Sequence, residues 1–301
     1  MSDSTNSNSV VLPKTLKRRE FLYGLGSLAA LSPMSVLAAM RTDESFGGLP
    51  IGMHGATLSG FSNEEALRIV VEDFGLRRWE LTPSQVRFLD YESGPYIGPK
   101  ASLGEVKTLR RTMDAAGVRA TAYGLLPFQN NADENRRLFE FASELGVRNL
   151  TCIPELDSLD GLELLADEYN MRLAIHNNGP RGVFRKISEV TSALEGRGEY
   201  VGACLDIGHT LRNSEDPAWA LRQLGSKTFG LHLKDVSGTG ADSDVIGLGD
   251  GLLDTASFFE ALRTVELPAD IAISLEYLIE RSNPQPGVLK SLQITENELS
   301  R

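Results

Sequence analysis

From Leu49 onward, short apolar segments rich in β-branched residues alternate eight times with longer segments of helical periodicity. This alternation predicts parallel strands joined by crossover helices. Eight such units within about 250 residues favour a closed barrel over an open sheet. No Gly-x-Gly-x-x-Gly motif follows the first strand, which weighs against a dinucleotide-binding sheet. We therefore expect an α/β protein with a single (β/α)8 TIM-barrel domain over residues 49–301.

The strand segments are short, and the helical segments begin at cap-like residues or end at glycine. The expected strands are Ile51–Leu58, Arg78–Leu81, Arg119–Leu126, Asn149–Ile153, Arg172–His176, Val201–Ile207, Phe229–Val236 and Ile271–Tyr277. The expected helices cover 62–75, 103–117, 133–146 and 159–169, and four more begin near Phe184, Pro217, Thr255 and Gly287.

The first 40 residues have the pattern of an export signal. Arg18 and Arg19 precede an apolar stretch from Tyr23 to Ala39 with small residues at its end, which resembles a twin-arginine signal peptide. The alternative is an uncleaved anchor, since about 17 apolar residues are near the minimum for a membrane span. We expect a periplasmic or exported protein with residues 41–48 as a linker, and no stable membrane association once the signal is cleaved.

The charge balance argues against polyanionic partners. The chain has a net charge of −11, and beyond residue 40 it carries 26 basic and 39 acidic residues, a net charge of −13. Such a surface repels nucleic acids and anionic membranes, so neither is an expected partner. Cys152 and Cys204 lie in apolar strand-like segments and are expected to be buried free thiols.

Four of the expected strands end in residues that bind metals. His176, Asp206, His232 and Glu276 each end one of the last four strands, and the carboxyl ends of barrel strands share one rim. Two imidazoles and two carboxylates form a mixed donor set that suits a divalent cation, with Mn or Zn first and Mg, Co or Fe also compatible. We expect these four residues to be metal ligands.

The motifs around these residues resemble a known family. The runs 204–209 (CLDIGH), 231–235 (LHLKD), 247–251 (GLGDG) and 274–277 (SLEY) are similar to those of the xylose-isomerase-like sugar phosphate isomerase/epimerase superfamily. The resemblance covers roughly residues 50–290. It implies that Asp206, His232 and Glu276 bind the metal, that His209 contacts substrate, and that Glu276 transfers a proton.

One position departs from the epimerase pattern. Where the epimerases usually have a second proton-transferring glutamate, this chain has His176. Glu276, His209, Lys234 and His176 are therefore the candidate catalytic residues, and His54, Glu80, His209 and Asn178 are the candidates for binding substrate. Glu80 or Glu155 could replace the missing carboxylate, or each could form a structural ion pair. Lys234 could polarise a substrate oxygen or pair with Asp206 or Asp235.

These features predict a divalent-metal-dependent isomerase or epimerase that removes a proton next to the carbonyl of a sugar and forms an enediolate. Expulsion of a leaving group from the same intermediate would make the protein a 3-keto-glycoside lyase or hydrolase. A third possibility is a periplasmic sugar-binding barrel without turnover. The expected partner is a small-molecule sugar or keto-sugar glycoside.

Overall fold

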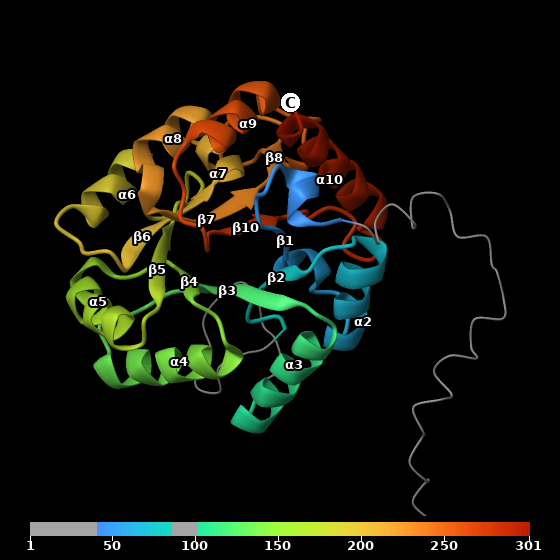
Figure 1. Cartoon of the computed structure of the whole chain (residues 1–301). Helices are drawn as coiled ribbons and strands as arrows, with labels where there is room; N and C mark the ends of the chain where they lie inside the picture. Colours follow the sequence, from blue (N-terminus) through green and yellow to red (C-terminus); the bar gives the residue numbers. More distant parts are fainter. Residues whose placement is uncertain (1–40, 86–100) are drawn as a thin grey trace, which may run out of the picture.

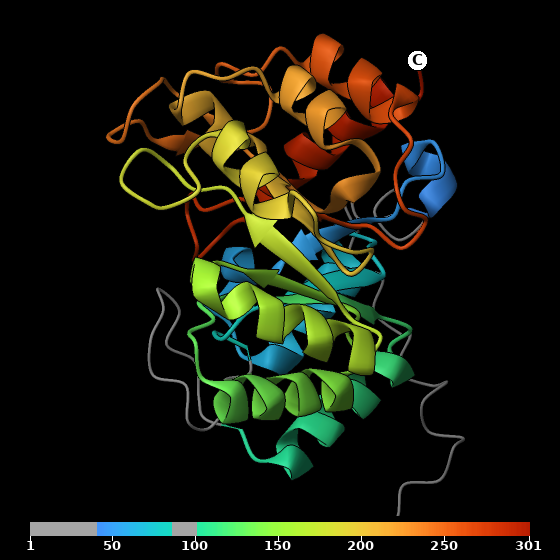
Figure 2. The same cartoon turned by 90° about the vertical axis from the view of Figure 1, so that its left-hand side faces the viewer.

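The computed structural model describes residues 41–85 and 101–301. The predicted signal peptide, residues 1–40, lies outside the described residues and stays a prediction. Eight parallel strands close into a barrel in the order β1-β10-β7-β6-β5-β4-β3-β2. Helices surround these strands (Figure 1), and the view turned by 90° shows the first and second halves of the chain on opposite sides of the barrel (Figure 2). The predicted (β/α)8 TIM barrel is confirmed.

All eight expected strands are present. They are β1 (Ile51–His54), β2 (Arg78–Leu81), β3 (Arg119–Leu126), β4 (Asn149–Cys152), β5 (Arg172–His176), β6 (Val201–Asp206), β7 (Thr228–Leu233) and β10 (Ala272–Leu275). A separate antiparallel pair, β8 (Asp235–Val236) and β9 (Val245–Ile246), lies in the connection after β7.

The helices alternate with the strands as predicted. They are α2 (Asn63–Arg68), α3 (Leu103–Ala115), α4 (Ala132–Leu145), α5 (Leu159–Glu168), α6 (Ile187–Leu194), α7 (Ile207–Arg212), α8 (Pro217–Leu224), α9 (Thr255–Thr264) and α10 (Gln285–Leu299). A π-helical turn, Ile69–Asp73, extends α2, and short 3-10 helices cover Asp43–Phe46, Gly55–Leu58, Leu156–Ser158 and Gly225–Lys227. Within the described residues, no helix is long and apolar enough to cross a membrane.

Local chemistry sets where these helices begin and end. At the start of α3, Ser102 accepts a hydrogen bond from the backbone of Glu105, and the Glu105 side chain accepts one from the backbone of Ser102. This capping box satisfies two amides that a helix start leaves unpaired. Gly146 ends α4 with a φ of 80°, a left-handed conformation that glycine adopts without strain.

The strands are shorter at the barrel's carboxyl rim than the sequence predicts. The expected first strand continued to Leu58, but the chain turns into a 3-10 helix after His54 while its residues stay buried. The expected seventh strand is likewise divided into β7 and β8. Burial does not distinguish these turns from the strands, because Gly55–Leu58 and Lys234 are as buried as the strand residues beside them.

Residues 41–48, expected as a linker, contact the barrel. Their 3-10 helix buries Phe46 in the main hydrophobic core, next to α10 (Figure 1). Arg41 Nε lies 2.8 Å from Glu296 Oε1 of α10, and Arg78 of β2 pairs with Asp43. The segment therefore contributes to the stability of the domain.

Replacing Phe46 with alanine tests this contribution. The substitution removes a fully buried ring, so Phe46→Ala should lower the free energy of unfolding by about 3–5 kcal/mol. Leu103→Ala is the control, because Leu103 is exposed and its loss should change the free energy by less than about 0.5 kcal/mol. Urea unfolding measures both. Equal stability of the two variants would show that the segment does not support the barrel.

Candidate metal centre and active site

All four histidines of the chain gather at the carboxyl rim of the barrel. Strand register explains much of this: His176 lies beside Cys204, and His232 lies between Asp206 of β6 and Ser274 of β10. The ring centroids of His232 and His176 are 5.1 Å apart. Residues more than 50 positions apart in the chain therefore form one buried polar cluster.

The side-chain ligand atoms of three predicted metal ligands lie close together. His176, Asp206 and His232 offer ligand atoms that all lie within 4.8 Å of one another. Asp206 Oδ2 is 3.6 Å from His176 Nε2 and 3.8 Å from His232 Nδ1. Metal bonds of 2.0–2.2 Å place neighbouring ligand atoms roughly 3–3.5 Å apart, so both distances from Asp206 Oδ2 are close to the spacing that a bound metal requires.

Glu276, the fourth predicted ligand, faces the same nitrogen of His232 as Asp206 does. Its Oε2 is 3.9 Å from His232 Nδ1. Both His232 Nδ1 and Asp206 Oδ2 are buried without a hydrogen-bond partner, and Asp206 Oδ2 is ion-paired with Lys234. Buried polar atoms normally form hydrogen bonds, so these two atoms fit a cation site. The donor set, two imidazoles and two carboxylates, suits a divalent ion.

Asp206 has two structural tasks. As the N-cap of α7, it accepts a hydrogen bond from the backbone of His209 through Oδ1 at 2.8 Å, which leaves Oδ2 directed at the cluster. Burial alone would raise the pKa of Asp206, but His209, Lys234 and the other two imidazoles outweigh it and hold this pKa well below its usual range. The carboxylate is therefore ionised.

Glu80 orients His232. The Nε2 atom of His232 lies 3.1 and 3.2 Å from the two carboxylate oxygens of Glu80, so Nε2 carries a proton and Nδ1 faces Asp206 and Glu276. Burial opposes charge on His232, but Cys204, Glu80 and Asp206 raise its pKa, so binding of a metal at Nδ1 would release a proton. A carboxylate behind a ligating histidine fixes the ring and raises its basicity. Burial opposes charge on Glu80, yet His232 and a hydrogen bond from Ser274 lower its pKa.

Glu80 is fully engaged in the barrel interior. Thr151 donates to its Oε1 at 2.8 Å and Ser274 donates to its Oε2 at 2.6 Å, in addition to the His232 contacts. With 1% exposure it has no open surface for a substrate. Of the three roles considered for Glu80, the structure therefore favours the structural ion pair over substrate binding and over replacement of the missing carboxylate.

Lys234 bridges two of the predicted ligands. Its Nζ lies 2.8 Å from Asp206 Oδ2 and 2.7 Å from Glu276 Oε2. The Asp206 contact is ionic without good hydrogen-bond geometry. Burial alone would lower the pKa of Lys234, but the two carboxylates raise it, so the ammonium stays charged. Gly208 makes room for this side chain, since a Cβ there would lie 2.9 Å from Lys234 Cγ.

His54 faces the cluster from β1. Its Nδ1 accepts a hydrogen bond from the backbone of Ala56 at 3.3 Å, and burial lowers its pKa, so it is neutral with the proton on Nε2. Although His54, His232 and Glu276 form a second compact group, a protonated Nε2 is a donor rather than a metal ligand. This geometry suits the predicted substrate-binding role.

His209 lies on α7 at the edge of the cluster. Its Nε2 is 3.9 Å from Asp206 Oδ2, and its Nδ1 has no hydrogen-bond partner. Burial lowers the pKa of His209 to about 3, which keeps the imidazole neutral. Gly179 packs against this ring, because a Cβ there would lie 3.2 Å from Nδ1. This position is compatible with the predicted contact between His209 and a substrate, which stays a prediction.

The residues after His176 shape the rim. The Asn178 side-chain nitrogen donates to the backbone oxygens of Val183 and His176, so it holds the loop after β5, and only its side-chain oxygen is left for a substrate. Asn177, which the sequence did not single out, accepts from the Asp206 backbone at 2.7 Å and donates to Thr210. It fixes the start of α7 and with it Asp206.

Asp235 organises the glycine-rich loop at 247–251. Its carboxylate accepts hydrogen bonds from four backbone amides, those of Val236, Gly249, Gly251 and Leu253. Lys234 therefore pairs with Asp206 and Glu276, while Asp235 anchors the loop. Among the described residues, the site also uses Ser274 and Thr151, which sequence alone could not mark because both are ordinary strand residues.

A buried constellation of histidines, carboxylates and one lysine at the carboxyl rim of a (β/α)8 barrel defines a class of barrel proteins with a metal-binding donor set. The family described as "Xylose isomerase-like TIM barrel" matches residues 69–297. The chain belongs to this family.

Solved structures share the fold. An uncharacterized protein from Parabacteroides distasonis ATCC 8503 is 27% identical, with a TM-score of 0.61, over 82% of this chain and 98% of that one. The IolI protein with a bound zinc atom is 18% identical, with a TM-score of 0.65, over 84% and 98%. D-psicose 3-epimerase in the presence of D-fructose is 13% identical, with a TM-score of 0.60, over 84% and 97%. No curated protein sequence matched this chain.

The Glu80–His232 contact can be tested through metal affinity. Glu80→Gln keeps the shape but weakens the acceptor for His232 Nε2, so the affinity for Zn²⁺ or Mn²⁺ should fall about 10–100-fold. Titration calorimetry measures the change. Glu155→Gln is the control, because Glu155 is exposed and does not contact His232. If both variants bind metal equally well, Glu80 does not position the ligand.

Lys234→Met tests the ammonium between the two carboxylates. Without metal, the variant leaves Asp206 and Glu276 buried and uncompensated, so its free energy of unfolding should fall by about 3–5 kcal/mol. A divalent ion should restore much of this loss, and its affinity should exceed that for the wild type. Thermal unfolding with and without metal measures both effects. Lys290→Met, at an exposed surface pair, should show neither effect.

Proposed function

We propose that this protein is a divalent-metal-dependent sugar isomerase or epimerase-type enzyme that removes a proton next to a carbonyl. The observation that carries the proposal is the convergence of His176, Asp206, His232 and Glu276, with two buried ligand atoms that lack a hydrogen bond and one histidine fixed by Glu80. The solved D-psicose 3-epimerase with the same fold supports a sugar as substrate.

A divalent ion at this site would polarise adjacent oxygens of the substrate. Glu276 is the proposed base: burial opposes its charge, but Lys234 and His54 lower the pKa of Glu276 to about 2, so it is ionised at neutral pH. Its basicity would rise when Lys234 contacts a substrate oxygen in place of Glu276. Lys234 would stabilise negative charge that develops on a substrate oxygen, and His54 would donate a hydrogen bond from Nε2.

The positions of Glu80 and Glu155, the two candidates for a second base, favour proton transfer by Glu276 alone. Glu80 is committed to His232, Ser274 and Thr151. Glu155 is exposed and accepts a hydrogen bond from the backbone of Asn130. Among the described residues, Glu80 is therefore not free to act opposite Glu276, and Glu155 is exposed outside the buried cluster. Aldose–ketose isomerisation, which needs one base, is favoured over epimerisation by two carboxylates.

Elimination from a 3-keto-glycoside is the second candidate. It begins with the same proton removal and needs no second carboxylate, so His176 in place of glutamate is no obstacle. We further propose that the enzyme is exported, on the basis of Arg18, Arg19 and the apolar stretch that follows. A sugar-binding barrel without turnover is the remaining alternative.

Deuterium incorporation distinguishes these functions. The metal-loaded protein, incubated with keto and aldehydo sugars in D2O, should place deuterium on the carbon next to the carbonyl, as followed by NMR. Chelation of the metal should abolish incorporation, and Glu276→Gln should slow it about 10²–10⁴-fold. Glu155→Gln should leave it unchanged.

The other outcomes separate the alternatives. Release of the aglycone from a 3-keto-glycoside would establish elimination. Saturable sugar binding with neither deuterium incorporation nor aglycone release would indicate the binding barrel. Incorporation that survives complete metal removal would contradict the metal-dependent mechanism.

A further inference from the structure

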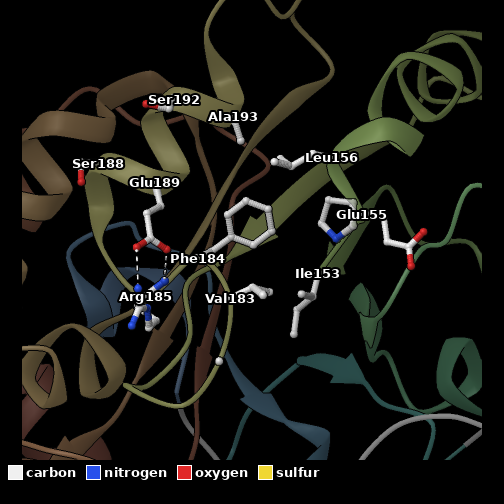
Figure 3. A pocket seen from close by; sticks show the side chains of 12 residues that line it. Ile153, Glu155, Leu156, Val183, Phe184, Arg185, Ser188, Glu189, Ser192 and Ala193 are labelled. Atoms are coloured by element: carbon white, nitrogen blue, oxygen red, sulfur yellow. Dashed lines mark hydrogen bonds and ion pairs between the residues drawn. The ribbon is translucent and has the colours of Figure 1, made fainter.

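An apolar groove lies on the rim next to the candidate site. It has a volume of about 800 Å³, within the range of roughly 300–1,000 Å³ typical of small-molecule sites. Figure 3 shows the Phe184 ring at its centre, with Ile153, Leu156 and Val183 around it. Leu156 is 64% exposed and Val183 is 58% exposed, so both present apolar surface to an incoming ligand.

The groove is continuous with the site through the loop after β5. One wall follows β4, and the other is the loop that begins directly after His176. Gly179 of this loop packs against His209, and Asn178 holds the loop's far end through the backbone oxygens of Val183 and Phe184. A molecule whose polar part reaches His209 is therefore next to the groove.

Two charged side chains of the groove pair with each other. Glu189 accepts a hydrogen bond from the backbone of Arg185 at 2.9 Å and lies 3.5 Å from its guanidinium, as the dashed lines of Figure 3 show. Glu155 accepts a hydrogen bond from the backbone of Asn130 at the edge of the groove. The aliphatic side chains and the Phe184 ring supply most of the remaining lining, which favours an uncharged apolar group.

The backbone conformation of Phe184 indicates that the groove is a preformed ligand site. Its φ of 53° lies in the left-handed region, which is costly for an aromatic residue. The backbone oxygen of Phe184 accepts a hydrogen bond from Asn178 at 3.0 Å, which holds this conformation. Strained residues held by their surroundings occur preferentially at ligand sites.

We propose that this groove binds an apolar aromatic substituent on the substrate, such as the aglycone of a glycoside, while the sugar ring lies at the polar cluster. The polar cluster would hold the sugar's hydroxyl groups, and the groove would exclude water from the aromatic ring. The placement of the sugar rests on the second proposed function, elimination from a 3-keto-glycoside, because an aglycone on the anomeric carbon blocks aldose–ketose isomerisation. The preference of the groove for an aromatic group does not depend on turnover.

Two probes that differ only in aglycone test the proposal. Phenyl β-D-glucopyranoside and methyl β-D-glucopyranoside are titrated into the metal-loaded full chain, with binding measured by calorimetry or ligand-observed NMR. The phenyl glycoside should bind at least about tenfold more tightly. The double variant Leu156→Ser/Val183→Ser should lose most of this preference. Leu164→Ser is the matched control, because Leu164 is 73% exposed on α5 outside the groove, and it should keep the preference.

Each result decides the proposal. A wild-type protein without a phenyl preference, including one that binds neither probe, overturns it, as does a double variant that keeps the preference. Sedimentation experiments could show that the wild-type protein dimerises and that the double variant does not. This result would mean that a second copy of the chain covers the groove, and it would also overturn the proposal. These experiments measure affinity, so their result does not depend on whether deuterium is incorporated. Conversely, the groove proposal can be wrong even if the protein incorporates deuterium.

Discussion

Buried negative charge is the constraint on which the site depends. Glu80, Asp206 and Glu276 lie within one barrel interior, and each must be offset by donors or cations to remain ionised there. Two arrangements provide this. His232 and two hydroxyl groups satisfy Glu80, whereas Lys234 bridges Asp206 and Glu276. The first arrangement is closed by well-directed hydrogen bonds, and the second is an ionic bridge that a divalent cation could replace.

The short segment His232–Asp235 contributes to the metal-ligand cluster, to the ionic bridge between the carboxylates and to the glycine-rich loop. His232 presents a ligand atom, Lys234 supplies the cation, and Asp235 accepts four backbone amides from the loop beyond. Leu233 packs into the hydrophobic core between them. Because adjacent side chains of a strand point in opposite directions, so short a run can fix both the cluster and the loop that borders it.

The sequence predicts the barrel because strand and helix periodicities are local. It also predicts that His176, Asp206, His232 and Glu276 meet, because parallel strands end at one rim. It does not predict the partners of Glu80, since these come from Thr151, His232 and Ser274 on three other strands. Their meeting across the barrel depends on closure and register. The groove is equally hidden, because it forms between two loops and depends on the left-handed backbone at Phe184.

The substitution of histidine at position 176 changes what the site can do in a specific way. A carboxylate there would add a fourth negative charge beside Asp206, and Lys234 alone would not offset it. Histidine keeps a ligand atom 3.6 Å from Asp206 and adds no negative charge. The cost is a second carboxylate at this position, and among the described residues of the barrel interior Glu80 is committed to His232. The proposed chemistry, whether isomerisation or elimination, therefore relies on Glu276 as the base.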